Sequence, residues 1–190
     1  MTPITHSQRY GWAGSVRAFL KVSLQAWLDA LQAHHLLSLG DAPATSQVTA
    51  WQECFGELTT QLNQMVKLFP PAIEWGIVFE YELPRERGRR PDVIIVAQDG
   101  FVVLEFKGYG DSKRSFLDQV SAYVRDLRAY HEASHGLSGR AVLVLMGSST
   151  APAQAEDVTV CGRGHLVEVL TEWSRGPGTS GIGAEALDDW

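Results

Sequence analysis

Apolar residues along the chain recur with two different periods, and the change between them divides the sequence. In residues 15–37 and 46–69 they recur every three to four positions, the spacing of one face of a helix. The two stripes comprise Val16, Phe19, Leu20, Leu24, Trp27, Leu28 and Leu31, then Trp51, Phe55, Leu58, Leu62, Met65 and Val66. We therefore expect an N-terminal pair of helices, with Ser15 capping the first and Pro70-Pro71 ending the second.

After Pro71 the pattern becomes strand-like. Ile77, Phe79, Tyr81 and Leu83 alternate with Val78, Glu80 and Glu82, so Glu80 is expected to point away from Phe79 and Tyr81. The remaining expected elements are strands at 92–97, 101–106, 140–147 and 158–161, and helices at 113–134 and 164–173. This order predicts an α/β fold with a central mixed sheet of four to five strands, flanked by helices.

The same pattern predicts how the chain is organised. Residues 1–70 form a helical segment packed on the core, beginning with an irregular arm at 1–13, and residues 71–174 form the core itself. The stretch 175–190 is rich in Gly and Ser and is predicted to be a linker or tail.

Composition narrows the functional classes. The 190 residues are 45% apolar and 20% charged, and the net charge of -6 argues against a general nucleic-acid coat protein, which would be basic. It does not exclude an enzyme with a local basic path, since nine of the 16 Lys and Arg residues lie between Arg85 and Arg128. No secretory leader and no apolar run long enough to cross a membrane is visible, so we expect a cytoplasmic protein without membrane contact.

Three charged residues lie at the ends of two apolar runs, 93–96 and 101–104. Asp92 precedes the first run, and Glu105 and Lys107 follow the second. Charged groups are costly to bury unless they are paired, so these three are expected to have partners.

The turn between the two runs decides whether the charges meet. Asp99-Gly100 favours a two-residue hairpin turn, which would set Asp92 opposite Lys107 and Ile94 opposite Glu105. Facing residues point to the same side of a sheet, so all three charges would share one face. The other face would carry Val93, Ile95, Leu104 and Phe106. A three-residue loop would instead move Asp92 to the opposite face.

Two interpretations fit two acids and one lysine on a single face. One is a structural ion pair at the end of a sheet. The other is a divalent-metal site, because Mg²⁺ binds one or two carboxylates together with waters and a substrate phosphate, and two neighbouring acids repel one another unless a cation lies between them.

The residues Pro91-Asp92 and Glu105-Phe106-Lys107 resemble the PD-(D/E)xK signature of the restriction-endonuclease-like nuclease superfamily. The following helix carries Gln119 and Tyr123, and this Gln-x-x-x-Tyr spacing resembles the additional motif of RecB-type nucleases. Residues four apart share a helical face, so both side chains can face the site. The alternatives are a core aromatic for Tyr123 and a solvated helix residue for Gln119.

This resemblance implies roles for the residues. Asp92, Glu105 and the carbonyl of Phe106 would bind Mg²⁺ or Mn²⁺, and Lys107 would position the attacking water. Glu80 resembles the acidic residue that supplements such sites from a neighbouring element, and its alternative role is to pair with Arg89 or Arg90.

A wider resemblance covers residues 9 to about 150. The segments "RYGW", "AWQECFGEL", "IVFEYELPRERGRRPDVII", "LEFKGYG" and "DQVSAYVRDLRAYH" are similar to the nuclease-like N-terminal region of bacterial Schlafen-like DNA/RNA helicase proteins. That family continues into an ATPase, whereas this sequence contains no G-x-x-x-x-G-K-[ST] phosphate-binding loop. The chain is then either a piece of a longer protein or a relative that works with a separate ATPase or helicase.

The resemblance implies a metal-dependent nuclease that acts on DNA in preference to RNA, in phage defence or DNA repair, with a homodimer as one arrangement. An alternative from another class is a nuclease-fold module that binds nucleic acid or a partner of a helicase system without cutting.

A third reading comes from His131-Glu132-x-x-His135, which matches the H-E-x-x-H motif of zinc metallopeptidases. The motif requires both histidines on one helical face, and Gly136 follows immediately, where a helix would fray. Residues 84–91 form a basic connector that carries Arg85, Arg87, Arg89 and Arg90. Together with Lys113, Arg114, Arg125 and Arg128 it could follow a phosphate backbone.

Overall fold

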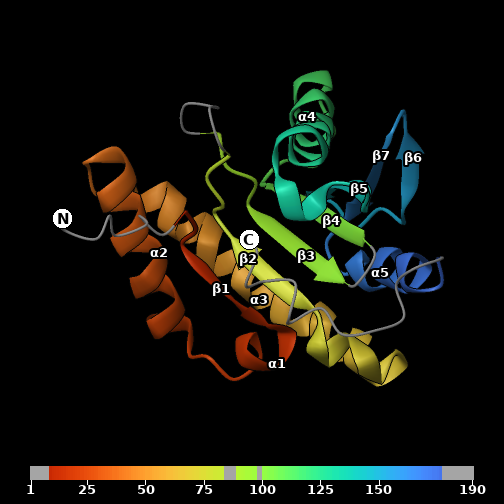
Figure 1. Cartoon of the computed structure of the whole chain (residues 1–190), viewed down its shortest axis with the longest axis horizontal. Coiled ribbons are helices and arrows are strands. Elements are labelled where there is room, and N and C mark those ends of the chain that lie inside the picture. Colours follow the sequence, from red (N-terminus) through yellow and green to blue (C-terminus); the bar gives the residue numbers. More distant parts are fainter. Residues whose placement is uncertain (1–8, 84–88, 98–99, 177–190) are drawn as a thin grey trace.

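A mixed β-sheet forms the centre of the molecule (Figure 1). The computed structural model describes residues 9–83, 89–97 and 100–176. Within these residues the sheet has seven strands in the order β1-β2-β3-β4-β5-β7-β6. They are β1 Trp12–Ser15, β2 Gly76–Phe79, β3 Val93–Ala97, β4 Gly100–Lys107, β5 Ser138–Leu145, β6 Ala153–Ala155 and β7 Val158–Gly162. The α/β class is confirmed, and the sheet is larger than the expected four to five strands.

The sheet combines two kinds of pairing. Strands β1 to β4 are antiparallel to their neighbours, and β6 is antiparallel to β7. The pairs β4–β5 and β5–β7 are parallel. The helix between β4 and β5 therefore makes the crossover connection that parallel neighbours need.

The helices in the described residues correspond closely to the expected segments. They are α1 Val16–Phe19, α2 Leu24–Leu39, α3 Thr45–Leu68, α4 Arg114–Tyr130 and α5 Leu166–Ser174, with 3₁₀ turns η1 Pro70–Glu74 and η2 Glu132–Ser134. Ser15 caps the first helix as predicted, but that helix ends at Phe19 and a second one starts after Ser23, whose hydroxyl accepts from the amide of Ala26 at 3.2 Å. The single helix expected over residues 15–37 is therefore divided into α1 and α2, and Ser23 caps the second of them.

Two short strands, β1 and β6, were not predicted from the sequence. Strand β1 lies partly in the expected irregular arm and pairs Trp12 with Phe79. Strand β6 adds three residues at the far edge. Neither segment shows the alternation of a half-buried strand, so its conformation is decided by pairing with a neighbour rather than by local preference.

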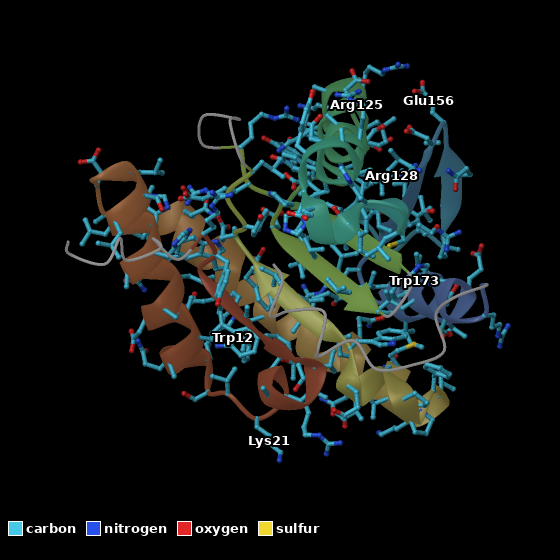
Figure 2. All side chains as sticks on the ribbon, viewed as in Figure 1. Trp12, Lys21, Arg125, Arg128, Glu156 and Trp173 are labelled. Atoms are coloured by element: carbon cyan, nitrogen blue, oxygen red, sulfur yellow. The ribbon has the colours of Figure 1, made fainter. Side chains whose placement is uncertain are left out.

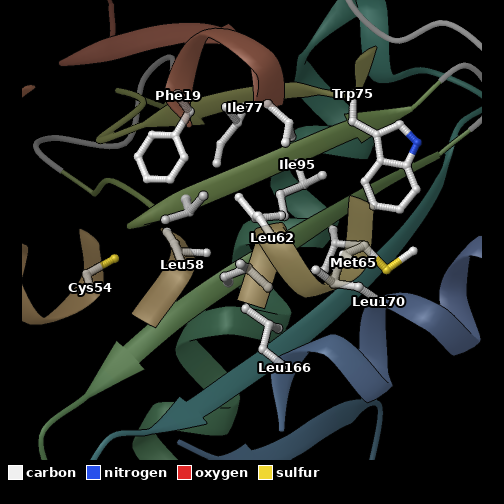
Figure 3. Packing of buried hydrophobic residues seen from close by; sticks show 14 of the residues in the cluster. Phe19, Cys54, Leu58, Leu62, Met65, Trp75, Ile77, Ile95, Leu166 and Leu170 are labelled. Carbon is white, nitrogen blue, oxygen red and sulfur yellow. The ribbon is translucent and has the colours of Figure 1, made fainter. Parts of the chain in front are cut away.

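Each face of the sheet has its own hydrophobic core. On one face α1, α2, α3 and α5 pack against the strands, and Figure 3 shows Leu58, Leu62 and Met65 of α3 meeting Ile77 and Ile95 of the sheet. On the other face α4 packs through its apolar side chains. Figure 1 shows α4 on the side away from α2 and α3, so the sheet is covered on both faces.

Strand β2 ends earlier than the alternation predicted, because Glu80 has a φ of 54°. This left-handed conformation is uncommon outside glycine and interrupts the pleat. Ile77 and Phe79 belong to the core under α3, whereas Tyr81 and Leu83 belong to the core under α4. The expectation that all four share one face, opposite Glu80, is therefore wrong.

The hairpin between β3 and β4 differs from the expected register by two residues. Ala97 pairs with Gly100 and Val93 with Leu104, so Gly100 lies in the strand rather than in the turn. The other expected turn residue, Asp99, lies outside the described residues. Continuing this register places Asp92 beside Glu105 instead of Lys107. A shift of two residues keeps every side chain on its face, so the predicted convergence of the three charges survives.

No helix in the described part of the chain is both long and apolar enough to cross a membrane.

Candidate active site

Three carboxylates gather where β2, β3 and β4 meet one edge of the sheet. Glu80 follows the end of β2, Asp92 directly precedes β3, and Glu105 lies near the end of β4. Because these neighbouring strands are antiparallel, the end of β2, the start of β3 and the end of β4 lie together. Glu80 and Glu105 are only 7% and 2% exposed.

Glu105 is the most strongly held of the three. Its Oε1 accepts hydrogen bonds from Lys107 Nζ at 2.8 Å and from Gln119 Nε2 at 2.9 Å. Its Oε2 is buried without a hydrogen-bond partner. Burial, then repulsion from Asp92, raises the pKa of Glu105 to about 8, against the opposing attraction of Lys107. One oxygen is therefore oriented while the other remains available.

Asp92 is fixed by the backbone of the next strand. Its Oδ2 accepts from the main-chain N–H of Phe106 at 2.7 Å. Burial raises the pKa of Asp92 to about 6, and the Phe106 amide and the charge of Lys107 oppose that rise. Main-chain N–H and C=O groups of one strand residue point to the same side of the strand, so the Phe106 carbonyl also lies on the Asp92 side of β4.

Glu80 completes the group with different partners. Its Oε1 accepts from the indole Nε1 of Trp51 at 2.7 Å, and its Oε2 lies 3.7 Å from Arg90 Nε. The contact with Arg90 is the one that the structural alternative for this residue predicted. Burial and repulsion from Asp92 raise the pKa of Glu80 to about 7. Glu80 also has a left-handed φ, which in a non-glycine residue lowers the stability of the fold by roughly 1–3 kcal/mol.

Gln119 and Tyr123 approach from α4, on the face that the i,i+4 spacing predicted. The Gln119 amide that donates to Glu105 also donates to the Tyr123 hydroxyl at 2.9 Å. Arg89 lies over the Tyr123 ring, 5.1 Å from its centroid, and pairs with Asp126 at 3.2 Å. The pair is connected to the carboxylates, and Tyr123 is at the same time part of the core under α4.

A small cavity of about 150 Å³ opens beside the carboxylates on the α3 side of the sheet. Its polar lining comprises Gln47, Trp51, Glu80, Asp92 and Lys107. Apolar side chains from α2, α3 and the strands close the rest, including Trp27, Leu31, Cys54, Phe79 and Phe106. The site therefore has α4 on one face of the sheet and a hollow on the other.

Asp92 and Glu105 present the oxygens that a divalent cation takes. In the part of the chain that is described, no group of three or more His, Cys, Asp or Glu side chains is placed to hold a metal ion. Mg²⁺ needs fewer protein ligands than such a group provides, since it keeps several waters and binds one or two carboxylates together with substrate phosphate. The unpartnered Oε2 of Glu105 and the adjacent Asp92 fit that smaller donor set for Mg²⁺ or Mn²⁺.

The zinc-peptidase reading loses its structural basis. Helix α4 ends at Tyr130, and His131 is its C-cap in an extended conformation. Residues 132–134 form a 3₁₀ turn, and His135 is again extended. The expected helix to residue 134 is therefore wrong, and the two histidines do not share a helical face.

Four of the basic residues expected to follow a phosphate backbone, among those that the structure describes, form ion pairs with nearby acids. Beyond Arg89 and Arg90, Arg114 pairs with Asp118 and Glu156, and Arg125 lies 3.6 Å from Asp126. Arg85 and Arg87 lie outside the described residues. Figure 2 shows Arg125 and Arg128 on α4, far from Lys21 at the opposite end of the molecule. These pairings reduce the positive charge available to a phosphate backbone.

One contact of the site was not predicted from the sequence. Trp51 donates to Glu80, although Trp51 was assigned only to the apolar stripe of its helix. The periodicity shows that an indole is buried but does not show which group its N–H meets. The alternation of β2, broken at Glu80, gave no sign that this carboxylate would turn toward α3.

Comparison with known proteins gives no matching family model, no matching curated protein and no matching solved structure.

Proposed function

We propose that the protein is a metal-dependent phosphodiester hydrolase, a nuclease of the PD-(D/E)xK type with a restriction-endonuclease-like core. The observation that carries this proposal is the juxtaposition of Asp92, Glu105 and Lys107 at one sheet edge, with one buried oxygen of Glu105 left unpartnered. These three residues are the ones on which the sequence resemblance to the PD-(D/E)xK signature rests. DNA is the substrate we favour over RNA, on the basis of that resemblance.

In this proposal Asp92, Glu105 and the carbonyl of Phe106 would hold Mg²⁺ or Mn²⁺. The bound ion would supply a water of lowered pKa and positive charge toward the phosphate. The chain's own residues do the rest. Lys107, 2.8 Å from Glu105, carries the ammonium that orients the attacking water and offsets charge developing on the phosphate oxygens.

Residues around this group act as positioning residues. Gln119 fixes the Oε1 oxygen of Glu105, while Oε2 has no hydrogen-bond partner. Tyr123 in turn fixes Gln119. Glu80 adds negative charge beside Asp92 from the cavity side, and this supplementary acidic role is the one we propose for it. Such outer partners typically change metal affinity or activity by roughly 10- to 100-fold.

A specific observation favours a second candidate, a nuclease-fold module that binds nucleic acid or a partner without cutting. Lys107 already neutralises Glu105, the Phe106 amide satisfies Asp92, and Arg90 pairs with Glu80, so the three acids have structural partners without a cation. The wider resemblance adds a working context for either candidate: phage defence or DNA repair beside a separate ATPase or helicase, as a monomer or a homodimer.

The test is cleavage of linear, circular and single-stranded DNA, and of RNA, with Mg²⁺ or Mn²⁺. Wild type is compared with Lys107→Ala and with Glu53→Gln, a variant of an exposed acid on α3. We expect cutting by wild type and Glu53→Gln, and none by Lys107→Ala or with EDTA. Equal faint cutting by wild type and Lys107→Ala would indicate contamination. Inactivity on every substrate would favour the binding module.

A further inference from the structure

An aromatic surface lies immediately beside the candidate active site, on its α4 side. Tyr109, just after β4, stacks on Phe116 of α4, with ring centroids 5.5 Å apart and ring planes 22° apart. Tyr109 is 55% exposed, whereas most large aromatic side chains of the described residues are buried in the two cores. We call the stacked rings of Tyr109 and Phe116 the aromatic platform.

Two lysine ammonium groups flank the aromatic platform. Lys113 Nζ lies 4.7 Å from the Tyr109 centroid and 5.7 Å from that of Phe116. Lys107 Nζ lies 5.2 Å from the Phe116 centroid while contacting Glu105 at 2.8 Å. Lys107 therefore belongs to the site and also borders the platform, and Lys113 places a second positive charge beside the exposed ring of Tyr109.

The loop that carries Tyr109 is held in place. Lys107 and Tyr109 accept main-chain hydrogen bonds from Met146 and Gly147 at 2.8 and 3.2 Å. Gly147 has no room for a side chain, since an added Cβ would lie 2.8 Å from the Tyr109 carbonyl carbon. The ring is thus presented by an anchored backbone, which lowers the entropy lost when a ligand stacks on it.

We propose that the aromatic platform binds an unpaired nucleobase of single-stranded DNA next to the phosphate held at the active site, an inference that rests on the proposed function. Every base has a flat face that stacks on an aromatic ring, and single-strand binding combines such stacking with positive charge along the backbone. Bases within a duplex already stack on each other, so the platform favours single strands and overhangs. Lys113 is exposed on a flexible stem and is free to move from the ring to a phosphate.

The test is binding rather than cutting, in EDTA, followed by fluorescence anisotropy. The probes are a labelled single strand of about ten nucleotides, the same strand with abasic positions, and a blunt duplex. The variants are Tyr109→Ala, Tyr109→Trp and Tyr130→Ala, the last removing a tyrosine that is 60% exposed at the other end of α4.

We expect Tyr109→Ala to weaken single-strand binding roughly tenfold, while Tyr109→Trp and Tyr130→Ala bind as wild type does. Abasic positions should weaken wild-type binding and leave Tyr109→Ala unaffected, and duplex binding should be equal in all variants. Failure of wild type to bind single strands, or an equal loss on single strand and duplex in Tyr109→Ala, would overturn the platform.

The two proposals fail separately in this design. Binding with the expected Tyr109 pattern but no metal-dependent cutting supports the platform and overturns the nuclease. Cutting that Lys107→Ala abolishes, without any Tyr109 effect on single-strand binding, supports the nuclease and overturns the platform.

Discussion

The side-chain amide of Gln119 joins helix α4 to strand β4, since its Nε2 donates to Glu105 Oε1 at 2.9 Å. The same oxygen accepts from Lys107 at 2.8 Å. Two donors on one oxygen fix the carboxylate plane, while Oε2 stays buried without a hydrogen-bond partner. The helix therefore contributes to the site by setting the orientation of a strand residue.

The first prediction concerns this orientation. Gln119→Leu keeps the side chain's bulk but removes its donor, so Glu105 loses one of the two contacts on Oε1. We expect metal-dependent cleavage to fall roughly 10- to 100-fold and the half-saturating Mg²⁺ concentration to rise. Tyr123→Phe, which keeps the Gln119 donor on Glu105, should have the smaller effect. An unchanged Mg²⁺ titration in Gln119→Leu would show that the amide does not position the ligand.

The second prediction concerns pH and stability without metal. Burial raises the pKa of Glu105 from 4.5 to about 8, and that of Asp92 from 3.8 to about 6. The folded state therefore binds more protons than the unfolded state between these values. Stability from these protonated acids is complete below the unfolded pKa and is lost as pH rises through the folded pKa. In EDTA the Tm should fall from about pH 5 to about pH 8.

Glu105→Gln tests that assignment, because the amide mimics the protonated acid at every pH. Its Tm should depend less on pH and should exceed that of wild type near pH 8. Glu53→Gln changes an exposed glutamate and should follow wild type. Added Mg²⁺ should raise the wild-type Tm more at pH 8 than at pH 5, since cation and proton compete for the same oxygens. A Tm that rises over this range in EDTA would contradict the raised pKa of Glu105.

Much of the site was predictable because strands have a period of two. The predicted hairpin register was wrong by two residues, yet Asp92, Glu105 and Lys107 still share a face, since an even shift preserves the side on which each residue lies. Gln119 was placed correctly for a similar reason, because i,i+4 residues of an amphipathic helix share a face.

The failures arose where tertiary structure overrides a local pattern. Glu80 adopts a left-handed φ although it is not a glycine, and nothing in the sequence indicates this. The alternation of β2 therefore could not show that the side chains after Phe79 change faces. Strand β1 exists because Trp12–Ser15 pairs with β2. The H-E-x-x-H spacing has meaning only on a helix, and α4 ends before His131, so the expected helical geometry is not formed.

The third prediction concerns the bond between Trp51 and Glu80, which spans 2.7 Å in a buried setting. This bond lowers the pKa of Glu80 and so favours its charged form, while burial and Asp92 raise the pKa to about 7. Trp51→Phe should cost about 1–3 kcal/mol, through the lost donor and the smaller ring, and the loss should be larger near pH 8 than near pH 5.

Urea unfolding at the two pH values measures the difference. Trp75→Phe is the matched control, because Trp75 is fully buried and its indole Nε1 has no hydrogen-bond partner. It should lose packing energy equally at both pH values. The same pH-independent loss in Trp51→Phe would mean that the indole acts by packing alone.

The fourth prediction concerns the start of α5, where no side chain of the helix itself caps the first turn. Helix α3 supplies the acceptors: Gln61 Oε1 accepts from the Val167 amide at 2.9 Å, and Glu57 Oε1 from that of Gly164 at 2.7 Å. Gln61→Leu leaves a buried N–H without a partner, which should cost about 1–3 kcal/mol in urea unfolding. Gln64→Leu, an exposed position on the same helix, should change stability little. Equal values for the two variants would show that α5 depends on its apolar packing rather than on these acceptors.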